Sequence, residues 1–171
     1  MSGSVLQLPD RVWRQIWTHL LPGTCLTEEA GFLLVSHSQL DNQRVFEYEQ
    51  WIPLRGTDFT RQYGDYLELA DSTKSRLIKS AHDKDACLVE FHSHPGPYPA
   101  MFSAADRLGF EDFVPHVLWR LKRRPYMAIV VASSGFDALV WTTDVGNPSQ
   151  LTRVQTEAGE FSPTNLTLKN W

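Results

Sequence analysis

The chain has 171 residues, of which 42% are apolar and 21% are charged, and its formal net charge is −4. This composition is ordinary for a globular protein, and the length suffices for one domain with its own hydrophobic core. The isoelectric point near 5.8 does not favour a nucleic-acid partner, because such proteins usually present a basic surface. No apolar run long enough to cross a membrane and no signal peptide is predicted, so we expect no membrane partner.

The first third of the chain predicts a helix followed by two strands. Apolar residues recur at helical spacing over residues 9–20, and Pro9 and Asp10 suit a first helical turn. The continuous apolar run GFLLVS at 31–36 is typical of a strand that is buried on both faces. Residues 43–54 are rich in β-forming side chains and predict a second strand.

The next segment predicts a loop, a short strand, a helix and a further strand. Polar residues dominate 55–65, which we expect to be a loop. Residues 65–70 predict the short strand, and 71–81 predict a helix. Residues 86–94 (ACLVEFHSH) favour β structure apart from Glu90 and carry two histidines at their end.

The last segment predicts a helix, a hairpin and a tail. The helix is expected to start at Ser103 and to break or restart at Pro115, because proline disrupts a helix interior. Residues 126–132 and 136–142 predict two strands joined by Ser-Ser-Gly, which suits a hairpin. We expect one more strand near 151–155 and a loosely ordered end after it.

A stretch with unusual residue spacing runs from the end of the strand predicted at 86–94 into the helix predicted to start at Ser103. His92 and His94 are separated by one residue and followed by Pro95, then by seven residues, Ser103, two residues and Asp106. Side chains at i and i+2 of a strand point to the same face, so the two imidazoles project together. Ser103 suits a helix N-cap, and a residue three positions later shares its face.

Two imidazoles and one carboxylate suit a catalytic zinc ion that keeps its fourth position for water. The chemistry that such a site favours is hydrolysis by a metal-activated water. Taken singly, these residues have ordinary interpretations: Ser103 would be only a cap, and Asp106 only a charge that matches the helix dipole. Their joint spacing favours the metal site.

The set HSHP, seven residues and SxxD resembles the JAMM motif of the JAB/MPN metalloprotease family, and the resemblance covers about residues 10–145. It implies an α/β (α+β) fold, a single domain over 1–171, with the C-terminal strand and tail at 146–171. The implied architecture is a mixed β-sheet that curls into a half-barrel flanked by helices, with the zinc site at the strand-to-helix junction.

The same resemblance implies a set of roles. His92, His94 and Asp106 would bind one Zn²⁺ ion, with water as the fourth ligand. Glu28, three residues before the glycine that opens the first apolar strand, would be the general base. Ser103 would donate a hydrogen bond to the developing oxyanion.

The implied activity is that of a zinc-dependent isopeptidase, similar to a deubiquitinase. It would cleave after the C-terminal glycine of a ubiquitin-like protein joined to a lysine or to a peptide extension. Expected partners are that protein, its conjugates and the matching activating and conjugating enzymes. The expected location is the cytoplasm, and the expected setting is a prokaryotic ubiquitin-like conjugation pathway, antiphage systems among them. The alternatives are a catalytically silent MPN scaffold and a hydrolase that acts on a sulfur carrier or a small substrate. Two histidines and one carboxylate also suit iron(II), but an oxygenase would leave Ser103 and Glu28 without a role.

Other candidate residues are weaker. Glu29 is expected to point away from the site, whereas Glu90 shares a strand face with the histidines. Glu90 could orient a ligand histidine, but we favour a partly exposed strand residue. Cys25 and Cys87 are too few for a disulfide framework, which predicts a reducing, cytosolic environment. Neither has a neighbour that suggests a nucleophilic thiolate, and the parity of Cys87 opposes that of His92.

Overall fold

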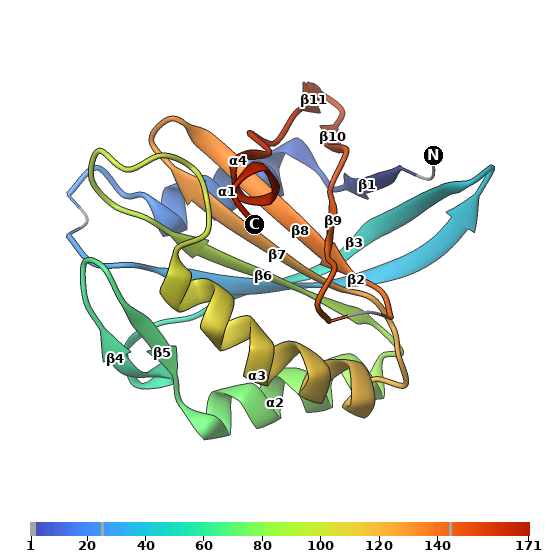
Figure 1. Ribbon diagram of the computed structural model, residues 1–171, viewed down its shortest axis with the longest axis horizontal. Coiled ribbons are helices and arrows are strands. Elements are labelled where there is room, and N and C mark those ends of the chain that lie inside the picture. The colour runs from blue at the N-terminus through green and yellow to red at the C-terminus, as the bar shows by residue number, and fades with distance from the viewer. Residues whose placement is uncertain (1–2, 25, 144) are drawn as a thin grey trace.

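The structure is a computed structural model that describes residues 3–24, 26–143 and 145–171. Cys25, one of the two cysteines considered above, lies outside the described residues. Nine strands in these ranges form one mixed sheet (Figure 1). From edge to edge they are β11 (Gly159–Phe161), β10 (Arg153–Thr156), β1 (Ser4–Gln7), β3 (Gln43–Pro53), β2 (Ala30–Leu40), β6 (Cys87–Ser93), β7 (Tyr126–Ala132), β8 (Gly135–Trp141) and β9 (Ser149–Gln150).

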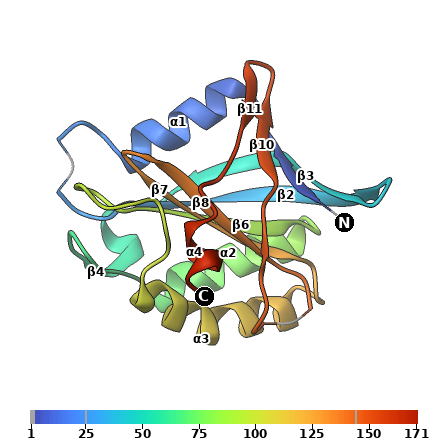
Figure 2. The ribbon, with the colours of Figure 1, turned by 45° about the horizontal axis from the view of Figure 1, so that its top comes forward.

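The sheet contains both parallel and antiparallel strand pairs. β6 runs parallel to its neighbour β7, and β1 runs parallel to both β3 and β10. The other neighbours are antiparallel, including the long β2–β3 hairpin and the β2–β6 pair. The sheet curls into a half-barrel, which Figure 2 shows from a second direction. This mixed α/β half-barrel confirms the predicted fold class.

Helices cover both faces of the sheet. α1 (Asp10–Leu20) lies on one face, and α2 (Asp71–Asp83) and α3 (Ala104–Arg120) lie on the other (Figures 1 and 2). A four-residue helix, α4 (Leu166–Lys169), lies close to the C-terminus. None of the helices formed by the described residues has the length and apolarity that a membrane crossing requires.

The sheet lies between two hydrophobic cores, and alternate side chains of strand β6 point into one core or the other. Val89 and Phe91 belong to the core under α1, whereas Leu88 belongs to the core under α2 and α3. Because alternate residues of a strand face opposite ways, His92 is directed to the α2/α3 face. Cys87 faces the α1 side, as predicted, so burial raises its thiol pKa to about 12.

Most predicted elements are confirmed, with three differences. The first is Pro115, which does not break its helix: α3 runs without interruption from Ala104 to Arg120. Pro115 is exposed, and so is Glu111, whose carbonyl loses its helical partner. Water can therefore satisfy that carbonyl, and the helix continues.

The second difference concerns 55–65, which was expected to be a plain loop. It contains the 3-10 turn η1 (Gly56–Asp58) and the strand β4 (Phe59–Gln62), which pairs with β5 (Leu67–Leu69) in a separate two-stranded sheet. Asp58 explains this order: its carboxylate pairs with Arg76 at 2.7 Å, and its carbonyl accepts from the Thr73 hydroxyl at 2.9 Å. Both partners lie on α2, so the local sequence could not predict the contact.

The third difference is the end of the chain, which was expected to be loosely ordered. The predicted strand is present as β10, but β11 and α4 follow it. β10 is ordered because it pairs with β1 from the start of the chain. Thr167 of α4 is also almost fully buried, which places the tail against the rest of the fold.

We predict that Phe91→Ala lowers the free energy of unfolding by about 3–5 kcal/mol, the usual range for removal of a large buried aromatic ring. Phe91 is fully buried and its ring lies 5.9 Å from that of Trp51, so the substitution leaves a cavity. Urea unfolding followed by fluorescence measures the change. Trp119→Ala, at a 73% exposed aromatic, should change stability by less than about 0.5 kcal/mol. Equal effects in the two variants would contradict this account of the core.

Candidate metal centre

The two histidines are delivered by the end of strand β6. His92 pairs with Ala30 of β2 on one side and with Val130 of β7 on the other, so its backbone is held within the sheet. His94 lies one residue beyond the strand, and its backbone N–H donates to the carbonyl of Val131 at 2.9 Å. Both side chains are buried. Strand pairing thus fixes the position of both imidazoles.

The carboxylate comes from the first turn of α3. Ser103 is the N-cap, as predicted: its hydroxyl accepts from the Asp106 N–H at 3.1 Å. In return, Asp106 Oδ2 accepts from the Ser103 N–H at 2.7 Å, which completes a capping box. These reciprocal bonds hold the Asp106 side chain at the helix start and turn its other oxygen toward the strand.

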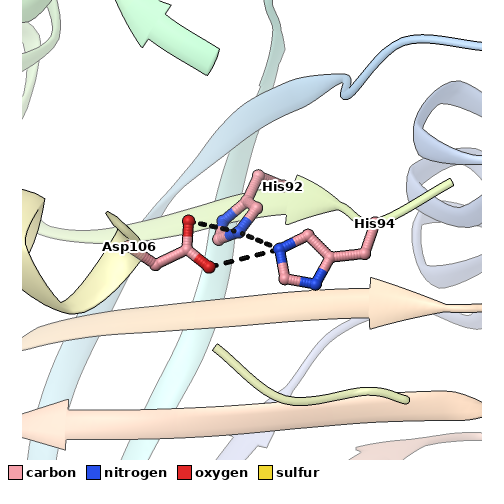
Figure 3. A group of neighbouring side chains, drawn as sticks. All are labelled: His92, His94 and Asp106. Atoms are coloured by element: carbon pink, nitrogen blue, oxygen red, sulfur yellow. Dashed lines mark hydrogen bonds and ion pairs between the residues drawn. The ribbon is translucent and has the colours of Figure 1, made fainter. Parts of the chain in front are cut away.

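The three side chains converge on one point (Figure 3). Nε2 of His92 lies 3.2 Å from Asp106 Oδ1, and Nε2 of His94 lies 3.2 Å from Asp106 Oδ2. The two Nε2 atoms are 3.3 Å apart, and one donor atom from each residue falls within 4.8 Å of the others. The structure therefore brings together the three side chains that the sequence proposed as metal ligands.

The cluster is electrostatically suited to a cation. Burial alone would lower the pKa of His92, but the carboxylates of Asp106 and Glu90 outweigh it and raise that pKa well above its usual value. Burial alone would raise the pKa of Asp106, but the imidazoles of His92 and His94 hold it well below its usual range. The site thus favours an ionised carboxylate with positive charge beside it, and a metal ion can take the place of the protons.

Glu28 lies beside these donors. Its side chain is only 4% exposed, and its Oε1 is 3.8 Å from His94 Nε2. Burial raises its carboxyl pKa above the usual value, which suits a group that must accept and return a proton near neutral pH. Its backbone is held by Tyr63, whose carbonyl accepts from the Glu28 N–H at 2.7 Å, and by the Gln62 amide, which donates to the Glu28 carbonyl at 2.9 Å.

The neighbouring residues link Glu28 to the histidine strand. The Glu29 N–H donates to the Ser93 hydroxyl at 2.9 Å, and the Ser93 N–H donates to the Glu29 carbonyl at 3.0 Å. Ser93 lies between the two histidines, so this pair of bonds sets Glu28 relative to them. The Glu29 carboxylate accepts from Thr27 at 3.4 Å instead. Position 31, at the start of β2, requires a glycine, because a Cβ there would lie 2.2 Å from the Trp51 ring.

Glu90 is a partly exposed strand residue, as we favoured, and it also makes the contacts of the alternative role. Its Oε1 lies 3.5 Å from Nδ1 of His92, and its Oε2 accepts from the Tyr126 hydroxyl. It therefore occupies the position of a carboxylate that orients a ligand histidine. Tyr126 was missed because it sits in an apolar strand, where an aromatic residue is an ordinary core choice; only its place beside β6 gives it this contact.

A cleft of about 550 Å³ opens next to the cluster, between the β4–β5 sheet, α2 and α3. Glu28, His92 and Asp106 line it together with Tyr66 and Phe113. The donor atoms can therefore be reached from outside the protein.

The donor set also fits a resident metal ion. Two imidazole nitrogens and one carboxylate oxygen supply three protein ligands, the count that leaves one coordination position for water or substrate in catalytic zinc sites. With Nδ1 of His92 turned toward Glu90, its Nε2 is the nitrogen presented to a cation. His92, His94 and Asp106 are thus positioned to hold a metal ion.

The curled mixed sheet carries a His-His-Asp cluster at a strand-to-helix junction. The profile of the family described as prokaryotic homologs of the JAB domain matches residues 9–143, and the chain belongs to this family. No curated protein matches the sequence. Among solved structures, the fold is similar to the solution structure of protein DSY2949 from Desulfitobacterium hafniense, with a TM-score of 0.52. That match has 14% sequence identity and covers 89% of this chain and 94% of the other, so it shows a likeness of fold alone.

We predict that Asp106→Asn abolishes stoichiometric zinc binding at micromolar concentrations. An amide oxygen is a weaker ligand than a carboxylate and carries no charge against the cation. Isothermal titration with Zn²⁺ measures the loss, and Asp112→Asn on the same helix serves as the control. Unchanged zinc affinity in the Asp106 variant would contradict the proposed ligand set.

We predict that Glu90→Gln weakens zinc binding by about 10-fold or more, the usual effect of removing a carboxylate that orients a ligand histidine. Tyr126→Phe should give a smaller loss, because it removes only the donor that holds Glu90. Competition with a chromophoric chelator provides the affinities. Glu47→Gln, at an exposed strand position, is the matched control and should bind zinc as the wild type does.

Proposed function

We propose that the chain is a zinc-dependent isopeptidase of the JAMM type. The observation that carries this proposal is the buried Glu28 carboxyl, which lies 3.8 Å from His94 and lines a cleft shared with His92 and Asp106. A ligand cluster alone would suit a structural metal. A buried proton acceptor beside the ligands, with an open cleft on the same side, is the arrangement that hydrolysis of an amide requires.

Zinc suits this donor set, and when bound by His92, His94 and Asp106 it would polarise a carbonyl oxygen and lower the pKa of a water to about 7. The residues of the chain then divide the proton work. Glu28 accepts a proton from the attacking water as the oxygen–carbon bond forms. As the carbon–nitrogen bond breaks, Glu28 returns that proton to the leaving amine. Its position beside the proposed ligands, 3.8 Å from His94 Nε2, supports both steps.

Ser103 is proposed to stabilise the negative oxygen of the tetrahedral intermediate. Its oxygen already accepts from the Asp106 N–H, which leaves the hydroxyl proton for donation to a substrate oxygen. Pro95, directly after His94, shapes the chain as it leaves the strand. A preorganised donor at this place typically contributes about 10²–10³ in kcat.

The proposed substrate is a ubiquitin-like protein, cleaved after its C-terminal glycine, either from a target lysine or from a peptide extension. Membership of the prokaryotic JAB family supports this choice. The matching activating and conjugating enzymes would be functional partners, and an antiphage conjugation system is the proposed setting. We propose a cytoplasmic location, which is supported by a cysteine count too low for a disulfide framework.

We predict that Glu28→Gln retains one zinc ion but lowers kcat for cleavage of a ubiquitin-like protein with a C-terminal extension by about 10²–10⁴-fold, the usual contribution of a general acid–base residue. Mass spectrometry follows the cleaved product, and elemental analysis gives the metal content. Glu29→Gln is the matched control, because it makes the same change one residue away, where the side chain contacts Thr27.

The other outcomes separate the alternatives. Full activity in the Glu28 variant would show that this carboxylate is the wrong base, and Glu90 would be tested next. If the wild type binds zinc but cleaves none of a panel of ubiquitin-like and sulfur-carrier proteins, the scaffold interpretation gains. Cleavage of sulfur carriers alone would assign the site to that substrate class.

A further inference from the structure

The end of the chain contacts the loop that leads into α3. The Thr164 hydroxyl donates to the Ala100 carbonyl at 2.6 Å, and the Phe102 N–H donates to the Thr167 hydroxyl at 2.9 Å. Thr167 is 1% exposed although it is polar. In Figures 1 and 2, α4 lies beside the loop between β6 and α3. Thr164 and Thr167 lie beyond residue 143, where the family match ends, whereas their partners in the loop lie within it.

A buried carboxyl group holds this end segment in place. Asp137 on β8 is fully buried, and its Oδ2 accepts from the Thr167 N–H at 2.9 Å. Its Oδ1 accepts from the N–H groups of Asn165 and Ala138 at 3.1 and 2.9 Å, and from the Gln150 amide at 3.2 Å. A carboxyl group without such donors would be costly to bury. Asp137 therefore sets the place of the Thr167 backbone.

Phe102 connects the C-terminal segment to the metal centre. Its side chain is 1% exposed, and its ring centroid lies 5.7 Å from that of His92 and 5.2 Å from that of Phe110. It directly precedes Ser103, the cap whose N–H holds Asp106. One residue thus touches a proposed ligand from the strand and sits next to the cap that orients the ligand from the helix.

We propose that Thr167, held by Asp137, is a positioning residue for the metal centre. Its hydroxyl fixes the buried N–H of Phe102, which sets the Phe102 ring against His92 and the start of α3 against His94. Without that acceptor, the Phe102 N–H is left unpaired in the interior, and the loop has to shift to satisfy it. This inference rests on the proposed metal centre, and it assigns the C-terminal tail a part in building the site.

The test compares three variants of the full chain: Thr167→Val, which keeps the shape but removes the hydroxyl; Thr167→Ser, which keeps the hydroxyl; and Thr156→Val. Thr156 is the matched control, a 9% exposed threonine on β10 whose hydroxyl contacts Asp10. Two quantities are measured. Hydrogen exchange of the peptide over 95–106 in the metal-free protein reports how firmly Thr167 holds the loop before α3. Competition with a chelator reports zinc affinity.

We expect Thr167→Val to exchange at least about 10-fold faster over 95–106 and to bind zinc about 10-fold more weakly, the usual effect of a lost supporting contact. Thr167→Ser should restore both values, and Thr156→Val should change neither. If the 95–106 peptide of Thr167→Val exchanges at the wild-type rate, Thr167 does not hold this loop and the proposal is overturned. Faster exchange with unchanged zinc affinity overturns the coupling to the site, and equal losses in the Thr156 variant reduce the effect to general destabilisation. If the wild type binds zinc but cleaves nothing, the proposed function fails while this inference is still decided by both readouts.

Discussion

The carboxylate of Asp106 joins the two parts of the molecule that the site requires. Its two oxygens lie 3.2 Å from Nε2 of His92 and of His94, while one of them also accepts from the Ser103 N–H at the start of α3. The strand end and the helix start are thereby connected through one side chain. Because two imidazoles and a buried carboxylate stabilise one another only in this arrangement, the loop, the cap and the strand end must all keep their positions.

The sheet supplies the rigidity that this arrangement needs. β6 lies between β2 and β7, so both backbone edges of the histidine strand are paired. Phe91 packs into the hydrophobic core on the α1 side of β6, and the polar side chains of the site lie on the opposite face of that strand. Glu28 lies in the segment before β2, where the two hydrogen bonds between Glu29 and Ser93 join that segment to the histidine strand. A site built on paired strands and a capped helix varies less in geometry than one built on loops, which suits catalysis.

Two acidic side chains near the site, Glu90 and Asp137, are wholly or largely removed from solvent, and both have partners. Glu90 contacts His92 and Tyr126, and Asp137 on β8 accepts four hydrogen bonds. Such groups are costly to bury unless they are satisfied. They therefore favour one arrangement of strand, loop and tail over alternatives in which an acceptor would be left empty. The tail belongs to this set through Thr167.

The sequence by itself determined the elements and the ligand set. Strand alternation placed His92 and His94 on one face, the Ser103 cap placed Asp106 in a first turn, and the spacing of these residues indicated the family. Tertiary structure alone decided the roles of Glu90, Tyr126, Asp137 and Thr167, because each depends on a partner brought close by strand pairing or by the returning tail. It also decided that α3 continues through Pro115, since solvent exposure, not local propensity, satisfies the freed carbonyl. Local patterns report which face a side chain occupies, but only the assembled fold reports what it meets there.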